Sequence, residues 1–157
     1  MIIGTGGVST FALKLARAAG LHIILTSSSD TKLGQIQQQL GKPEIQTVNY
    51  KTHPEWHEEV LRLTNGIGVD LVVENGGSSS LVQSMLCTRR GGIVSQVGYL
   101  GGPQAKHLEA FVSTIIDRRL NVRYEHSLAL PRTQFEGFLT ENSGASMLDP
   151  RMIRMTL

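Results

Sequence analysis

The first nine residues, MIIGTGGVS, constrain the fold of this chain more than any other stretch of it. Three apolar residues run directly into a glycine cluster, and an amphipathic helical pattern follows from Ser9. Gly4 allows a tight reversal at the strand end, and Gly6, which has no Cβ, allows an anion to approach the backbone. The N–H groups of the helix that begins near Val8 then face that anion, and the helix dipole favours it. The segment predicts a strand, a phosphate-binding turn and a helix.

The third position of the G-x-G-x-x-G pattern is Ser9 instead of glycine. Serine is small enough for close packing of a helix on a strand. Its hydroxyl can also donate a hydrogen bond to a phosphate. The candidate phosphate-binding residues are Gly4, Thr5, Gly6, Gly7, Val8 and Ser9.

Composition narrows the class of protein. The chain has 157 residues and a net charge of +2, which suits one domain and gives no reason to expect nucleic acid or an acidic membrane surface. Its single cysteine, Cys87, has no partner for an internal disulfide, which favours a reducing compartment. Neither a secretory leader pattern nor a membrane-spanning apolar run is found, so we expect a cytoplasmic protein.

Apolar strands alternate with helical patterns along most of the chain. Strands are predicted at 1–3, 21–25, 45–49, 69–74, 93–97 and 121–128, and helices at about 9–19, 33–40, 54–64, 81–86, 107–118 and 131–141. This order predicts an α/β fold with a doubly wound, mostly parallel six-stranded sheet and helices on both faces. Ligands of such sheets bind beyond the carboxyl ends of the strands. The tail from 143 to 157 has no periodicity, so the predicted domain spans 1–142.

Two local patterns add detail to the helices. Phe11, Leu15 and Ala18 lie at helical spacing and predict the buried face of the first helix. Thr52 followed by Glu55 predicts a capping box at the start of the third helix.

Several motifs follow one another along the chain. They are Gly4-Thr5-Gly6-Gly7-Val8, the Thr-Ser-Ser-Ser-Asp-x-Lys-Leu stretch at 26–33, Val48-Asn49-Tyr50, Gly66-Ile67-Gly68-Val69-Asp70, and Gly91-Gly92 leading to Val97-Gly98. By these motifs, the chain resembles the cofactor-binding domain of the medium-chain dehydrogenase/reductase superfamily over about residues 1–140. The quinone reductase-like and zinc-type alcohol dehydrogenase-like branches are most similar.

The resemblance implies a Rossmann fold and an NAD(P)-dependent oxidoreductase acting on a carbonyl, an alcohol or an activated alkene. In that family a separate catalytic domain supplies the zinc ligands and the proton-relay groups. We therefore expect a truncated piece that binds the cofactor, lacks the substrate domain and is inactive alone. Two other functions stay open: a non-catalytic nucleotide-binding or interaction module, and a methyltransferase that uses S-adenosylmethionine. Such methyltransferases have an acidic residue at the end of the first or second strand, and this chain has none at either position.

The end of the second strand bears on cofactor choice. NAD-specific Rossmann domains place an acidic residue there for the ribose 2′-OH, and the resemblance places Ser27 at that position. Hydroxyls and a lysine accept a 2′-phosphate, so Ser27, Ser28 and Lys32 favour NADP(H) over NAD(H). The resemblance adds Tyr50 beside that phosphate. Asp30 lies past the strand, where we expect it to cap the next helix; a serine-rich turn with no role in cofactor binding is the alternative.

The resemblance also implies that the exits of the fourth and fifth strands bracket the nicotinamide. Backbone contacts carry this role, so side-chain identity says little, and ordinary turn glycines are the alternative. The residues concerned are Asn75, Gly76, Val97, Gly98, Tyr99 and Leu100. Asp70 and Glu74 share a strand face but lie roughly 13 Å apart at the rise of a strand, too far for joint acid–base work.

No catalytic residue or metal ligand is expected within this chain. His53 and His57 lie four residues apart on the predicted third helix, a spacing that can bind a metal. Without a third ligand nearby, an exposed polar face is the better interpretation. Cys87 is predicted to be a small buried residue. The edge of the sixth strand, 121–128, is predicted to join two copies into a homodimer.

Overall fold

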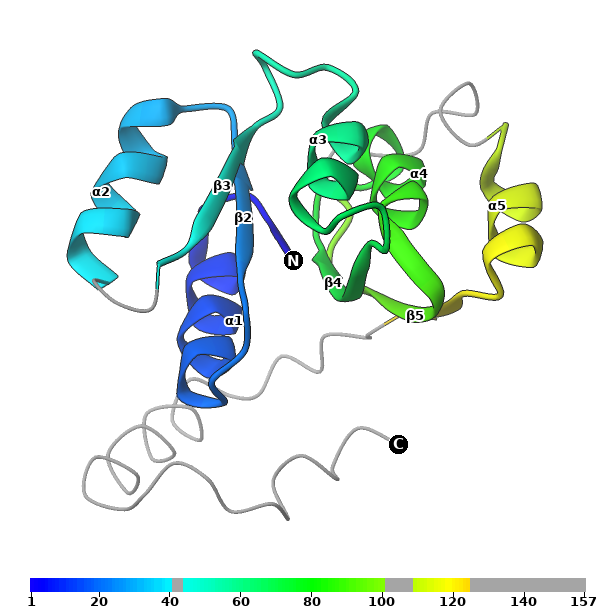
Figure 1. Cartoon of the computed structure of the whole chain (residues 1–157), viewed down its shortest axis with the longest axis horizontal. Coiled ribbons are helices and arrows are strands. Elements are labelled where there is room, and N and C mark those ends of the chain that lie inside the picture. The colour runs from blue at the N-terminus through cyan, green and yellow to red at the C-terminus, as the bar shows by residue number, and fades with distance from the viewer. Residues whose placement is uncertain (41–43, 101–108, 125–157) are drawn as a thin grey trace.

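The structure, a computed structural model, describes residues 1–40, 44–100 and 109–124 (Figure 1). In this part of the chain six strands form one parallel sheet in the order β3-β2-β1-β4-β5-β6. The strands are β1 (Ile2–Ile3), β2 (Ile24–Ser27), β3 (Gln46–Asn49), β4 (Val69–Glu74), β5 (Thr88–Gln96) and β6 (Asn121–Tyr124). The strand order reverses direction between β1 and β4, so the predicted doubly wound parallel sheet is confirmed.

Helices cover both faces of this sheet, as predicted. They are α1 (Gly7–Ala18), α2 (Asp30–Leu40), α3 (Trp56–Leu63), α4 (Ser78–Leu86) and α5 (Phe111–Arg118). Figure 1 shows α1 and α2 together on one side of the sheet and α3 and α4 on the other. A hydrophobic core lies on each face of the sheet, and successive strand residues point into different cores. Ile2 belongs to the same core as Leu13 of α1, while Ile3 belongs to the same core as Val60 of α3. Both faces of the central strands are therefore buried, as in other parallel sheets.

The buried face of α1 is not the one predicted. Phe11 and Leu15 are 42% and 49% exposed, whereas Ser9 and Leu13 are buried and Ala12 packs beside them. Both sets of residues have helical spacing, so the pattern alone could not choose between them. The buried set includes Ser9, whose hydroxyl bonds to β1, and Leu13, which joins the core on this face of the sheet.

The predicted caps of two helices are also wrong. Ser29, not Asp30, caps α2: its Oγ accepts a bond from the backbone N–H three residues later, at 3.4 Å, and Asp30 is already helical. Before α3, Thr52 Oγ1 donates to the carbonyl oxygen of Asn49 at 3.2 Å, and Glu55 at the N-cap makes no side-chain cap bond. Before α3, the Asn49 carbonyl oxygen thus takes the Thr52 hydroxyl that the capping box requires.

β1 and β3 each begin one residue later than predicted, and β2 and β5 differ more from their predicted bounds; β2 begins at Ile24 instead of Leu21. β2 runs to Ser27 instead of ending at 25, because Thr26 and Ser27 pair with β3 and are buried despite their hydroxyls. β5 begins at Thr88, so Gly91-Gly92 lies inside the strand, where its pairing with β4 shifts register. Gly91 has φ +72°, a conformation that suits glycine at such an irregularity.

Several predicted segments lie outside the described residues: the start of the 107–118 helix, the end of the 121–128 strand, the 131–141 helix and the 143–157 tail. None of the helices in the described ranges has the length and apolar character that a membrane crossing requires.

Candidate functional site

All the candidate residues lie just beyond the carboxyl ends of the strands, called the strand exits below. Because the strands are parallel, these ends all lie on the same side of the sheet. At the reversal point, the chain leaves β1 for α1 on one face and leaves β4 for α4 on the other. Ligands of such sheets bind in the crevice between two strand exits of this kind. The exits carry Gly4–Ser9 after β1, Ser27, Ser28 and Lys32 after β2, Tyr50 after β3, Asn75 and Gly76 after β4, and Val97–Leu100 after β5.

The glycine turn leaves the start of α1 open. Gly4 has φ +82°, and its N–H donates to the carbonyl oxygen of Thr26 at 3.0 Å, which ties the turn to β2. A methyl group at Gly6 or Gly7 would meet no other atom within 4 Å. The first turn of α1 has no side-chain cap and no acidic residue. Its backbone N–H groups are therefore available to an anion at the positive end of the helix dipole.

The Ser9 hydroxyl is bonded within the protein. Ser9 is buried, and its Oγ donates to the carbonyl oxygen of Ile3 at 2.7 Å. Ser9 Oγ also accepts a hydrogen bond from Nδ2 of Asn75 at 3.2 Å. Because a hydroxyl has one proton, Ser9 has none left for a phosphate. What the small side chain does provide is close contact between α1 and β1.

The exit of β2 presents hydroxyls and a lysine. The Ser27 side chain is nearly covered and accepts a bond from the N–H of Ser29 at 3.3 Å. Ser28 is half-buried and Lys32 is exposed, so these two groups are the more open to a ligand. Tyr50, 38% exposed, is held beside them by a bond from its N–H to the carbonyl oxygen of Ser27 at 3.1 Å.

Asn75 connects the loops on the two sides of the crevice. Its side chain reaches Ser9 in α1, and its carbonyl oxygen accepts a bond from the N–H of Leu100 at 3.2 Å. Gly98 lies so close that a Cβ there would be 3.3 Å from the Asn75 Cβ. The structure thus brings the 4–9 turn, the 75–77 turn and the 97–100 loop together around one residue.

Glu74 has a role at this site that was not predicted from the sequence. Its carboxylate is completely buried and accepts bonds from the N–H of Gly76 at 2.6 Å, from Ser80 Oγ at 2.7 Å and from Ser84 Oγ. Three donors compensate the burial of the charge. Glu74 thereby fixes the 75–77 turn to α4. Two serines four residues apart on one helix face were the available sequence signal.

The other titratable candidates lie apart from the crevice. Asp70 forms a 2.6 Å ion pair with Arg89, whose guanidinium holds the pKa of that carboxyl below its usual range. His53 precedes α3 instead of lying on it, so the predicted helical spacing to His57 is wrong. Burial raises the pKa of the Cys87 thiol to about 12, which makes it unreactive and confirms its predicted burial.

In the described ranges, no group of three or more His, Cys, Asp or Glu side chains is placed to hold a metal ion.

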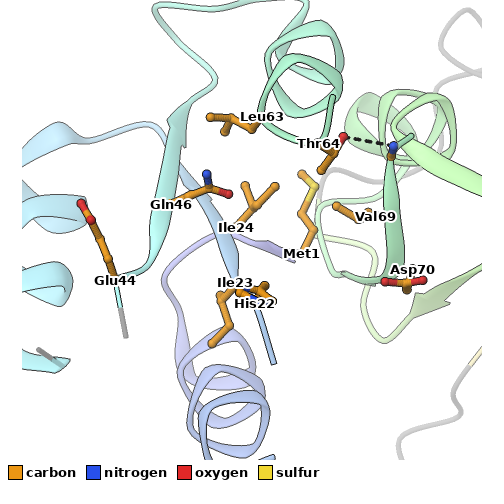
Figure 2. A pocket seen from close by; sticks show the side chains of 11 residues that line it. Met1, His22, Ile23, Ile24, Glu44, Gln46, Leu63, Thr64, Val69 and Asp70 are labelled. Carbon is orange, nitrogen blue, oxygen red and sulfur yellow. Dashed lines mark hydrogen bonds between the residues drawn. The ribbon is translucent and has the colours of Figure 1, made fainter. Parts of the chain in front are cut away.

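A cavity of about 450 Å³ lies at the other end of the strands, where β2 and β4 begin (Figure 2). Met1, Ile24 and Val69 line it, and the α-amino group of Met1 donates to the carbonyl oxygen of Leu71 at 2.7 Å. Although Met1 is only half-buried as a residue, desolvation of its amino group lowers the pKa of that group to about 6. None of the candidate cofactor residues borders this cavity.

Comparison with known proteins adds family evidence. The family model described as zinc-binding dehydrogenase matches residues 7–141. A zinc-type alcohol dehydrogenase-like protein of Schizosaccharomyces pombe is 40% identical over 124 residues, which cover 78% of this chain and 35% of that protein. The NADP-dependent isopropanol dehydrogenase of Clostridium beijerinckii is 32% identical over 106 residues, 67% of this chain and 29% of that protein. The chain thus spans about a third of the length of these relatives.

Solved structures share the fold. A 2-haloacrylate reductase matches with a TM-score of 0.67 and 27% identity, over 80% of this chain and 38% of that one. The Escherichia coli quinone oxidoreductase, solved in complex with NADPH, matches with a TM-score of 0.67 and 22% identity, over 90% of this chain and 44% of that one.

Proposed function

The chain belongs to the zinc-binding dehydrogenase family, within the medium-chain dehydrogenase/reductase superfamily, and we propose that it is the part of an oxidoreductase that binds NADP(H). The observation that carries this proposal is the open glycine turn at the start of α1, at the point where the strand order reverses. Its free backbone N–H groups suit the cofactor's pyrophosphate. The backbone of Gly4 to Ser9 is assigned to this contact.

The exit of β2 supports the preference for NADP(H). It offers the Ser28 hydroxyl, the Lys32 ammonium and the Tyr50 ring at the surface, and Ser27 stands where NAD-specific domains have a carboxylate. A 2′-phosphate gains a charge-assisted bond from lysine, whereas a ribose hydroxyl gains little. The Clostridium relative is by name NADP-dependent, which agrees with this assignment.

The nicotinamide half of the cofactor is assigned to the exits of β4 and β5. Asn75, Gly76 and the 97–100 loop line that side of the crevice. When bound, the nicotinamide supplies or receives a hydride, and the substrate is a carbonyl, an alcohol or an activated alkene. Because the chain spans about a third of its relatives, we assign the substrate-binding groups and any zinc ligands to residues outside it.

The edge of β6 is proposed as the contact between two copies. Among the residues that the structure describes, β6 pairs only with β5 and is the last strand of the sheet, and Asn121–Tyr124 contains no proline. Tyr124 is 63% exposed there. Antiparallel pairing of two such edges satisfies the free N–H and C=O groups of both copies.

Titration of the 157-residue chain with NADPH, NADH and S-adenosylmethionine tests the proposed function. We expect NADPH to bind tightest, NADH more weakly, and S-adenosylmethionine not at all. Binding of S-adenosylmethionine alone would point to a methyltransferase, and binding of none of the three would refute a nucleotide-binding function.

A further inference from the structure

A directional chain of hydrogen bonds fixes the side chain of Asn75 in one orientation. Ser9 Oγ donates its only proton to the carbonyl oxygen of Ile3 at 2.7 Å, so toward Asn75 it can only accept. Asn75 must therefore present Nδ2 to Ser9, at 3.2 Å, and turn Oδ1 away from it. The positions of the amide nitrogen and oxygen follow from the hydrogen-bond network and not from shape alone.

The oxygen of this amide lies at the exit of β1. A methyl group at Gly4 would lie 3.8 Å from Asn75 Oδ1, which places that oxygen beside the glycine turn. Asn75 is half-buried, and among the described residues its Oδ1 accepts no hydrogen bond. An acceptor that is held in place and has no partner suits a hydrogen-bond donor on a ligand.

The backbone of the same residue is fixed from both sides. Glu74 accepts the N–H of Gly76, and the Asn75 carbonyl oxygen accepts the N–H of Leu100. The Oδ1 position is therefore set by both walls of the crevice and does not depend on a mobile rotamer.

We propose that Asn75 Oδ1 accepts a hydrogen bond from an amide or hydroxyl donor in the nicotinamide-ribose half of the cofactor. This inference rests on the proposed function and adds a side-chain role at a position where only backbone contacts were expected. It makes Asn75 a determinant of affinity for the nicotinamide end and not for the adenosine end.

Three variants separate this role from a structural one. Asn75→Leu keeps most of the side-chain volume but removes the acceptor and the donor. Ser9→Ala removes the group that orients the amide. Gln38→Leu, an exposed position on α2, is the matched control for loss of a side-chain amide.

The readout is affinity for two probes, NADPH and 2′,5′-ADP, measured by calorimetry. The second probe carries the adenosine and the 2′-phosphate but no nicotinamide riboside. We expect Asn75→Leu to weaken NADPH about three- to tenfold, the effect of one hydrogen bond, and to leave 2′,5′-ADP unchanged. Unchanged 2′,5′-ADP binding also shows that the variant is folded. Ser9→Ala should weaken NADPH binding less than Asn75→Leu does. The double variant should bind NADPH like Asn75→Leu, because both changes act on the same proposed hydrogen bond to Asn75 Oδ1.

A 3-acetylpyridine analogue of NADPH, which has no amide N–H, identifies the donor. If wild-type chain prefers the carboxamide cofactor and Asn75→Leu loses that preference, the carboxamide is the donor. If Asn75→Leu weakens both cofactors equally, the donor is a ribose hydroxyl.

The outcomes that overturn the inference are distinct from failure of the proposed function. Unchanged NADPH binding by Asn75→Leu would overturn the inference alone. An equal loss of affinity for NADPH and 2′,5′-ADP in Asn75→Leu would also overturn the inference, since that result assigns Asn75 a structural role. Wild-type chain that binds neither probe would refute the proposed function and this inference together.

Discussion

Replacing Glu74 with leucine should destabilise the chain strongly, because the change leaves three donors around this buried position without their acceptor. The donors are the N–H of Gly76 and the hydroxyls of Ser80 and Ser84. A buried donor left unpaired costs about 1–3 kcal/mol. The N–H cannot turn away, whereas the hydroxyls can rotate toward other acceptors. We therefore expect a loss of about 3–5 kcal/mol in the free energy of unfolding, a large part of the total for a domain of this size.

Glu74→Gln separates the hydrogen bonds from the charge. The glutamine oxygen can keep the bonds from Gly76 and Ser80, and its NH₂ group can donate to Ser84 once that hydroxyl turns. Only the charge assistance is lost, so we expect a cost of about 1–2 kcal/mol. Because Glu74 fixes the 75–77 turn, NADPH binding should weaken in the same order, leucine more than glutamine.

Urea unfolding followed by circular dichroism measures both changes. Glu58→Leu, at an exposed position on α3, is the control and should cost less than about 1 kcal/mol. If Glu74→Leu costs no more than this control, the carboxylate does not organise the turn and the reasoning is wrong.

Four further predictions concern the cofactor, the dimer, the amino terminus and catalysis. Lys32→Ala should weaken the binding of NADPH by about 1–3 kcal/mol and leave the binding of NADH unchanged. Equal losses of affinity for the two cofactors in fluorescence titrations would contradict the 2′-phosphate assignment. Proline at Val122 or Tyr124 should convert a dimer to monomers in light scattering, because it removes a donor from the β6 edge; a dimer indifferent to both prolines would place the contact elsewhere. The folded chain lowers the pKa of the Met1 amino group from 8.0 to about 6, so the unfolded state binds more protons in this range. The free energy of unfolding should therefore be highest above pH 8 and should fall by about 3 kcal/mol as the pH drops below 6; unfolding curves should show this fall, and N-terminal acetylation should abolish it. The chain alone should turn over neither quinones nor aldehydes with NADPH; robust turnover that Gly6→Val abolishes would place the active site within it.

Local signals were sufficient for the order of the elements. Strand β4 has the predicted bounds, Val69–Glu74, because it is an apolar run closed by glycine-containing turns on both sides. The glycine cluster after β1 likewise predicts the start of α1, since both the turn and the helix depend on neighbouring residues. Strand–helix alternation then limits the sheet to a parallel, doubly wound arrangement.

Contacts between distant segments decided what the sequence could not. The pairing of β2 with β3 extends β2 through Thr26 and Ser27, although hydroxyl residues after an apolar run resemble a loop. The register shift between β4 and β5 places Gly91-Gly92 inside a strand, where the local pattern predicts a turn. In both cases a neighbouring strand supplies the hydrogen bonds, and that neighbour is distant in the sequence.

The sequence by itself determined the family landmarks, the glycine turn and the exits that carry the candidate cofactor residues. Only the tertiary structure decided which side chains are committed to the protein itself. Ser9 gives its proton to Ile3, and Glu74 is enclosed by α4. Asn75 is oriented by a residue 66 positions earlier in the chain. The physical reason is that a hydroxyl or an amide bonds to whichever partner the fold places within about 3 Å, and residue spacing carries no information about such partners.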